Sequence, residues 1–322
     1  MTSTKIETYQ YLKDNPLVHV AIEDNFRKNI LNKIIQKYGS LTEYNKEKLH
    51  IERQTLRVQF KINKYFKFDR LIQIAKDVDI NENEVFNHIS KFFCRGSNTS
   101  KEIILSRYID IDEFFVEGYA LYLAEGDNGS NGLKRPRKFR FTNSEINVIN
   151  HMIAWLDKYF PLLKKYIMII KPKNYYGEIH TDFKIRHKIS EDKYNKIIKY
   201  RLCCDSAILI DLFLSLENTI KKMCSQDKSL ACAYIRGMMI GEGTVYNNRM
   251  RYVRIEMRNG KEIEYIHRLL LMLGYDCKIS YRTTRENMWS IYIGTRQLKK
   301  YYDEIGFGVH KKRQEKLKET IS

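Results

Sequence analysis

The chain has 322 residues, of which 43% are hydrophobic and 12% aromatic, enough for a globular protein with more than one structural unit. Its formal net charge of +18 indicates a polyanionic partner, and nucleic acid is the first candidate. No apolar run reaches the roughly 18 residues of a membrane span, and the first residues lack the apolar segment of a signal peptide, so we expect a cytoplasmic protein with no membrane partner.

Residues 1–105 are predicted to form a helical domain. The stretches "SLTEYNKEKL" and "ERQTLRVQFK", and then "FDRLIQIAKDVD" and "INENEVFNHISKFF", have helical hydrophobic patterns and are separated by turn-length gaps. A helix, a tight turn and a second helix are typical of a helix-turn-helix DNA-binding motif, and equally of a small helical bundle. Both interpretations stay open, and the first predicts additional DNA contacts.

Beyond residue 105, one pattern of helices and strands occurs twice. The helical runs "FFVEGYALYLAEGDNG" and "ACAYIRGMMIGEGTVYNN" both reach Glu-Gly, at Glu125 and Glu242, which lie 117 positions apart. Each is followed by strand candidates, an amphipathic helix, further strand candidates and a closing helix. The sequence therefore predicts an α+β fold with a duplicated αββαββα unit, divided into subdomains 106–222 and 223–322.

Small residues recur every four positions in both Glu-Gly helices, which places them on one helical face. Isolated glycines cost a helix about 1 kcal/mol each relative to alanine, so their presence predicts a close contact that rewards the missing side chain. We expect the two helices to pack backbone to backbone. The predicted contact residues are Ala120, Ala124, Ala233, Gly237 and Gly241.

The two helices are expected to end at the glycines that follow the glutamates. Gly126 and Gly243 occupy the position at which helices commonly end in a left-handed residue. The glutamates would then lie at adjoining helix C-termini, where their carboxylates repel each other and a divalent cation would relieve the repulsion. Carboxylate and carbonyl oxygens suit Mg²⁺, and the six cysteines contain no CxxC pair that would favour zinc.

The nonapeptides "GYALYLAEG" (118–126) and "IRGMMIGEG" (235–243) resemble the signature of the LAGLIDADG homing endonucleases, and the order of elements after each also agrees. The resemblance covers roughly residues 106–322, and the first copy is similar to the archaeal-type variant that ends in Ala-Glu-Gly. It implies a pseudo-two-fold monomer of prokaryotic, archaeal type, with saddle-shaped antiparallel sheets that bind double-stranded DNA. One departure is that the first copy has Ala120 at the position of the signature glycine and its own glycine at Gly118.

The resemblance implies that Glu125 and Glu242 are the catalytic acids, each serving one DNA strand. It also implies that these residues, with Gly126 and Gly243, bind Mg²⁺, for which Mn²⁺ would substitute, and that the activity is site-specific hydrolysis of phosphodiester bonds. A basic or polar residue beside the metal assists the attacking water in the family. Asn143, Lys261 and the basic cluster 134–138 are the candidates.

Basic residues gather on the strand candidates that follow both nonapeptides. In "KFRFTN", Lys138 and Arg140 share one face of the strand while Phe139 and Phe141 share the other, which predicts one core face and one face for phosphates or base edges. In the second copy the spacing of the arginines changes parity, which predicts a bulge or a change of face. The predicted DNA-contacting residues are Lys134, Arg135, Arg137, Lys138, Arg140, Arg249, Arg251, Arg254, Lys278, Arg282 and Arg285.

The alternative is a non-cleaving binder on the same scaffold, either an intron RNA maturase or a DNA-binding regulator. Such a binder would use the basic surface without the metal, and intron RNA would then be a second candidate partner. The presence of a glutamate in both copies favours the endonuclease.

Overall fold

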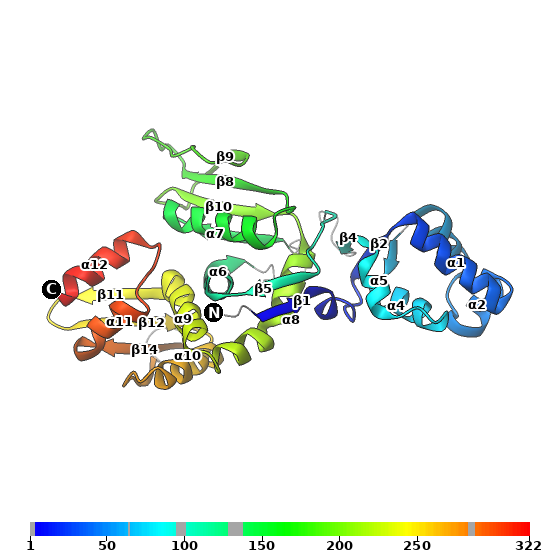
Figure 1. The fold of residues 1–322 in the computed structure, drawn as a ribbon. Helices are drawn as coiled ribbons and strands as arrows, with labels where there is room; N and C mark the ends of the chain where they lie inside the picture. Colours follow the sequence, from blue (N-terminus) through cyan, green and yellow to red (C-terminus); the bar gives the residue numbers. More distant parts are fainter. Residues whose placement is uncertain (1–3, 64, 95–100, 128–137, 283–286) are drawn as a thin grey trace.

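The computed structural model describes residues 4–63, 65–94, 101–127, 138–282 and 287–322. It has the predicted α+β composition, with a larger unit that contains the duplicated pattern and a smaller N-terminal unit beside it (Figure 1). In the described part of the chain, no helix combines the length and apolar character needed to cross a membrane.

The first repeat of the larger unit contains a five-stranded sheet in the order β6-β7-β10-β8-β9. Its pairs are antiparallel except β8 and β9, which run parallel; β9 is a strand that the sequence did not predict. The elements are α6 (Glu113–Glu125), β6 (Gly126–Asp127), β7 (Phe139–Asn143), α7 (Ile146–Tyr159), β8 (Lys165–Pro172), β9 (His187–Asp192), β10 (Lys199–Cys204) and α8 (Ala207–Cys224).

The second repeat contains a four-stranded, fully antiparallel sheet in the order β11-β12-β14-β13. Its order of first, second, fourth and third strand is the order of β6, β7, β10 and β8, so both repeats have the same topology apart from the added β9. The elements are α9 (Lys228–Glu242), β11 (Gly243–Asn247), β12 (Arg251–Met257), α10 (Gly260–Met272), β13 (Ile279–Arg282), β14 (Met288–Gly294), η4 (Thr295–Gln297), α11 (Leu298–Glu304) and α12 (Lys311–Ile321).

Helices α6 and α9 lie between the two sheets (Figure 1). One face of each sheet is apolar and buried, with Phe139 and Phe141 in the first repeat and Val253 and Ile255 in the second. Alternate residues along the same strands therefore face away from the core, as the pleat of a strand requires. The sheet faces turned away from the core are those that could meet a large ligand.

The N-terminal unit combines the expected short helices with a three-stranded sheet, β3-β2-β4, that the sequence did not predict. The "ISKFF" end of the last predicted helix belongs to strand β4, in which Phe92 and Cys94 are buried. Strand β2 is buried along its whole length, so its residues show no alternation that would have identified it. The elements are β2 (Val18–Ile22), α1 (Asp24–Tyr38), α2 (Leu41–Tyr44), η2 (Asn45–Leu49), α3 (Arg53–Val58), η3 (Gln59–Asn63), β3 (Tyr65–Lys67), α4 (Phe68–Asp77), α5 (Glu82–Asn87) and β4 (Ile89–Cys94).

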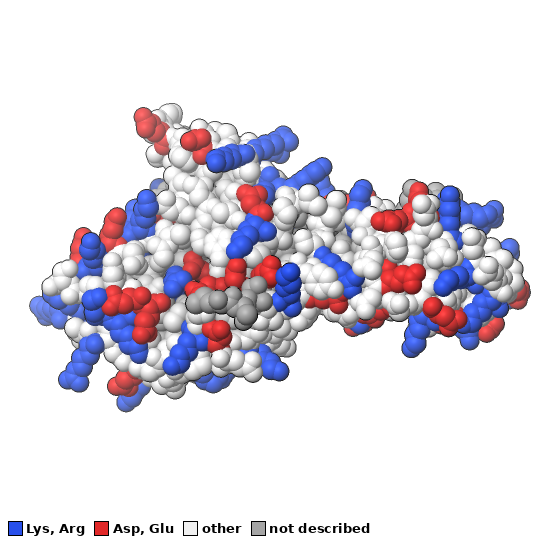
Figure 2. Space-filling model, viewed as in Figure 1, with Lys and Arg blue, Asp and Glu red and all other residues white. Residues whose placement is uncertain are grey.

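The two units are joined by a small antiparallel sheet of β1 (Thr4–Glu7) and β5 (Tyr108–Ile111). The short helix η1 (Thr8–Tyr11) directly follows β1. The Tyr11 hydroxyl lies 3.0 Å from the Thr219 hydroxyl on α8. The beginning of the described chain is therefore anchored beside the entry to α6. Lys and Arg side chains are spread over the visible face of both units (Figure 2).

Candidate functional site

Helices α6 and α9 run in the same direction, and their backbones are in close contact where they cross. A Cβ atom at Gly237 would lie 2.2 Å from the Glu117 carbonyl oxygen and 2.9 Å from the Ala120 Cβ. One turn later, a Cβ atom at Gly241 would lie 2.6 Å from the Ala124 Cβ. Any side chain at either glycine would therefore force the helices apart. Ala233, one turn before Gly237, is fully buried.

The contact pairs explain the repeat spacing. Ala120 faces Gly237, and Ala124 faces Gly241, with the same 117-residue offset that separates Glu125 from Glu242. The register of the two helices is therefore the register of the duplication. Both helices begin at an aspartate whose side chain caps the first turn: Asp112 accepts from Phe115 N and Asp227 from Ser229 N.

Gly118 does not belong to this contact. A Cβ atom there would lie 2.3 Å from Cδ1 of Trp155, a fully buried residue on α7. The glycine in the first nonapeptide thus gives room to the tryptophan in the core of its own repeat, while Ala120 takes the place at the helix crossing.

Glu125 and Glu242 lie at the adjoining ends of the two helices, and both are half-buried. The Glu125 Cγ would be 3.0 Å from a Cβ atom at Gly241, the residue before Glu242. Burial raises the pKa of Glu125 to about 7, and the neighbouring Glu242 carboxylate adds to the rise. Burial also raises the pKa of Glu242. The ionised pair is therefore disfavoured in the isolated protein.

Helices α6 and α9 end at Gly126 and Gly243 as predicted, but the prediction that these glycines are left-handed is wrong. Both are extended, with φ of −74° and −77°, and each begins a strand. Glycine is required at these positions by crowding: a Cβ atom would lie 2.4 Å from the Tyr122 carbonyl oxygen at Gly126 and 2.5 Å from the Met239 carbonyl oxygen at Gly243. The chain therefore passes directly from each helix into a strand.

Arg313, from the C-terminal helix α12, reaches the end of α9. Its Nη1 donates to the carbonyl oxygens of Met239, Ile240 and Gly241 at 3.1, 2.5 and 3.0 Å. Its positive charge also lowers the pKa of both glutamates, partly opposing the effect of burial. Arg313 was not predicted from the sequence, because nothing in the pattern of "HKKRQEKLKE" shows which of its cations turns inward.

Lys199, at the start of β10, is a second cation beside the acidic pair, and its charge lowers the pKa of Glu125. It was not among the predicted assisting residues. Of those, Asn143 uses its side-chain oxygen to accept from Glu145 N at 2.9 Å, and Lys261 is exposed on α10. The cluster 134–138 lies outside the described residues except for Lys138.

The outward face of the first sheet is polar. Arg140 is half-buried on β7 between the two core phenylalanines, and Arg201 on β10 donates to the Thr142 hydroxyl at 3.0 Å. Arg201 was not predicted from the sequence. Lys138 is tied to Asp205 by an ion pair of 2.9 Å. Lys134, Arg135 and Arg137 lie outside the described residues.

The outward face of the second sheet combines arginine with tyrosine. Arg254 is buried, forms an ion pair with Glu256 at 2.8 Å and lies over the ring of Tyr246. Arg282 on β13 lies 6.0 Å from the ring centre of Tyr292 on the same face. The register of β12 with its neighbours is regular, so the expected bulge is absent from this strand.

The remaining predicted contacts of the second repeat lie at the borders of the sheet. Arg251 donates to the Thr320 carbonyl oxygen at the end of α12. Arg249 lies in the turn before β12 and Lys278 precedes β13, and both are exposed. The change of parity in the sequence therefore reflects a turn and a strand border. Arg285 lies outside the described residues.

The donor set at the helix ends fits a hard divalent cation. The Glu125 and Glu242 side chains lie close enough for the Glu242 charge to raise the pKa of Glu125, and carboxylate oxygens suit Mg²⁺ or Mn²⁺. Within the described ranges, no group of three or more His, Cys, Asp or Glu side chains could hold a metal. Glu125 and Glu242 would therefore share the cation with backbone oxygens and with oxygens of the substrate.

Both repeats contain a helix that ends in Glu-Gly and leads into a sheet with the same order of shared strands. Residues 229–306 match the family model described as a LAGLIDADG-like domain, so the chain contains such a domain. No curated protein matches the chain.

Three solved structures illustrate what the chain is similar to. The structure of I-DmoI in complex with DNA and Mn is 18% identical, with a TM-score of 0.41, and the match covers 61% of this chain and 98% of that one. The homing endonuclease I-WcaI bound to its DNA recognition sequence is 13% identical, with a TM-score of 0.40 and coverage of 63% and 86%. The N-terminal LAGLIDADG domain of DUF199/WhiA is 15% identical, with a TM-score of 0.37 and coverage of 60% and 82%.

Proposed function

We propose that this protein is a site-specific endonuclease that cleaves both strands of double-stranded DNA with a divalent cation, Mg²⁺ or Mn²⁺. The observation that carries the proposal is the pair of half-buried glutamates at the adjoining ends of α6 and α9. A raised carboxylate pKa in a shared site is the arrangement expected where a cation completes the site.

The two helices position the acids. Because Gly237 and Gly241 present no side chain at the crossing, α9 approaches the backbone and the alanine methyl groups of α6 closely, and this contact sets the separation of Glu125 and Glu242. Gly126 and Gly243 then turn the chain into strands, so each acid lies where a helix meets a sheet. Each glutamate would serve one DNA strand, and the cation that they hold would activate water and stabilise the leaving 3′ oxygen.

The polar faces of the two sheets are the proposed DNA-binding surface. Arg140, Arg201 and Arg254 lie on the outward faces of strands in both repeats, and arginine pairs well with phosphates and with guanine edges. Lys199 is proposed as the residue that assists the attacking water, because it is the lysine whose charge acts on Glu125. One chain supplies both acids and both sheets, so we propose that the active species is a monomer.

The proposal is tested by cleavage of a plasmid that carries the native insertion locus of the gene. Wild-type protein should linearise the plasmid in Mg²⁺ or Mn²⁺ and leave it intact in EDTA. Glu125→Gln and Glu242→Gln should each abolish linearisation, and Glu264→Gln, on the surface of α10, serves as the matched control. Unchanged cleavage by both active-site variants would contradict the assignment.

A non-cleaving DNA-binding regulator is the second candidate, and one observation favours it. Arg313 already supplies positive charge next to both glutamates, as a protein that holds no cation would require. DNA binding that persists in EDTA, together with intact plasmid in every divalent cation, would support this candidate. An intron-RNA role is not proposed, because no comparison supports it.

A further inference from the structure

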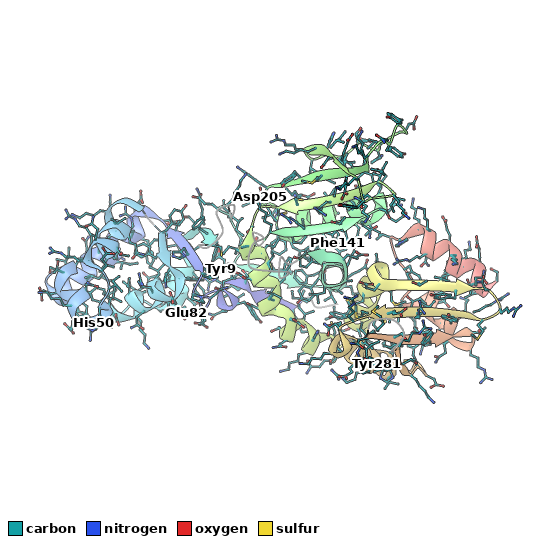
Figure 3. All side chains as sticks on the ribbon, turned by 180° about the vertical axis from the view of Figure 1, so that it is seen from behind. Tyr9, His50, Glu82, Phe141, Asp205 and Tyr281 are labelled. Atoms are coloured by element: carbon teal, nitrogen blue, oxygen red, sulfur yellow. The ribbon has the colours of Figure 1, made fainter. Side chains whose placement is uncertain are left out.

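The N-terminal unit contains two helix pairs joined by short turns, and their surroundings differ. The first pair is α2 with η2, a three-residue turn at 50–52, and α3 with η3. The second pair is α4 and α5. In Figure 3, His50 lies at the outer end of the unit, whereas Glu82, at the start of α5, lies on the side of Tyr9 and the junction with the larger unit.

The second pair is occupied by the rest of the protein. Glu82 accepts hydrogen bonds from Gln10 and Lys13, at 2.7 and 2.8 Å. Arg107, at the junction, donates to Asn83 and Asn87 along the same short helix. Helix α5 also begins with two glutamates, which would repel phosphates. This pair is therefore part of the joint between the units.

The first pair has a basic face. Arg53, Arg57 and Lys61 follow each other at intervals of four along α3 and η3, so they lie on one side of the helical segment, and all three are exposed. Among the described residues, none forms an ion pair with these three. Lys46 and Lys48, on the preceding helix, are instead paired with Glu43 and Glu47.

The geometry of the turn is fixed by specific interactions. His50 adopts a left-handed conformation with φ of 49°. The Asn45 side chain donates to the Ile51 carbonyl oxygen at 2.7 Å and accepts from Ile51 N at 3.2 Å. Leu56 and Phe60, three positions after Arg53 and Arg57, are buried in the core and fix the helix to it. These contacts attach the basic helix to the rest of the unit.

The three cations also line a surface hollow of about 300 Å³, together with Leu41, Thr42 and Asn45 from the first helix of the pair. Such a hollow, bordered by cationic side chains and a hydroxyl group, suits a phosphate group. Gln54 is exposed beside Arg53 and Arg57, and glutamine and arginine are the side chains that commonly read base edges in the major groove.

We propose that residues 41–63 form a second DNA-binding surface, which presents Arg53, Arg57 and Lys61 to duplex DNA beyond the stretch bound by the two sheets. B-form DNA is favoured over RNA because its major groove, about 12 Å wide, admits a helix, whereas the major groove of duplex RNA is too narrow for side chains to read. The proposal adds to the endonuclease function but does not depend on cleavage.

The test compares two full-length triple variants that lose the same charge. Arg53→Gln/Arg57→Gln/Lys61→Gln removes the proposed surface, and Lys28→Gln/Lys33→Gln/Lys76→Gln removes three cations from α1 and α4 of the same unit. Fluorescence anisotropy with a mixed-sequence DNA duplex in EDTA, over a range of salt concentrations, measures binding separately from catalysis. Circular dichroism and thermal unfolding confirm that both variants are folded.

The slope of log affinity against log salt should become shallower by about 2–3 for the first triple, since each phosphate contact contributes about 0.9, and it should stay close to the wild-type slope for the second. Equal slopes for the two triples would overturn the proposal while leaving the endonuclease function intact. The proposal would also be overturned if the first triple variant lost affinity for a structured RNA probe but not for the DNA duplex. If the wild-type protein binds no DNA at all, both proposals fail.

Discussion

Gly237 provides the most demanding test of the helix crossing. A Cβ atom there would lie 2.2 Å from a backbone oxygen of α6, whereas ordinary contacts begin near 3.4 Å. Gly237→Ala therefore requires the helices to separate by about 1 Å, since the obstructing atom belongs to a helix backbone and cannot change rotamer. The separation would also loosen the packing at Gly241 and shift Glu125 relative to Glu242.

The expected net loss of stability is about 2 kcal/mol. Overpacking of a close contact costs about 1–3 kcal/mol or more, and the better helix propensity of alanine returns about 1 kcal/mol at most. Because backbone atoms clash here, we expect the upper part of the overpacking range. Gly294→Ala is the matched control, since nothing lies within 4 Å of its added methyl group and its φ is −80°.

Guanidinium unfolding followed by tryptophan fluorescence measures both variants against wild type, and plasmid cleavage reports the geometry of the acids. Gly237→Ala should lower the unfolding midpoint and reduce cleavage, while Gly294→Ala should do neither. A Gly237→Ala variant with wild-type stability and activity would refute the backbone contact between α6 and α9.

Three further predictions concern charge. Glu125 has a pKa raised from 4.5 to about 7, so the folded protein binds a proton that the unfolded chain has released, and stability should fall as the pH rises through this range. In urea unfolding with EDTA, the free energy of unfolding of Glu125→Gln should therefore exceed that of wild type by about 1–2 kcal/mol at pH 8, after allowance for solvent screening, and by little at pH 4.5. A difference that does not change with pH would contradict the raised pKa. Arg313→Gln should lose about 1.5–3 kcal/mol of stability, because its hydrogen bonds to the carbonyl oxygens are lost. The same variant should bind Mn²⁺ severalfold more tightly in calorimetry, because a positive charge beside the glutamates is removed. Weaker Mn²⁺ binding would contradict this electrostatic role of Arg313. Non-specific DNA affinity should fall steeply between about 50 and 200 mM salt in anisotropy titrations, and a flat response would remove the electrostatic argument.

The sequence predicted the duplicated unit well, because its signals are local and repeated. Small residues at intervals of four and a terminal Glu-Gly define the paired helices without knowledge of the rest of the chain. The alternation around Phe139 and Phe141 likewise assigned the two faces of β7. Each of these patterns depends on residues within one helix or one strand.

Features that depend on distant segments were missed. Strand β2 is buried on both faces, so its composition does not separate a strand from a short helix. Arg313 lies 71 residues from Glu242, and Lys199 lies 74 residues from Glu125 and 43 from Glu242, so only the tertiary fold brings these cations to the acidic pair. The role of Gly126 and Gly243 was also misread, because crowding by a carbonyl oxygen, not a left-handed backbone, excludes a side chain.

Glu125 and Glu242 are proposed to hold one divalent-cation site together. Titration of Mn²⁺ into the full-length protein at pH 8, followed by electron paramagnetic resonance of the free ion, tests this directly and needs no knowledge of the DNA target. We expect saturable Mn²⁺ binding by wild type that is lost in Glu125→Gln/Glu242→Gln and retained in Glu264→Gln. Equal Mn²⁺ binding by wild type and the double variant would contradict it.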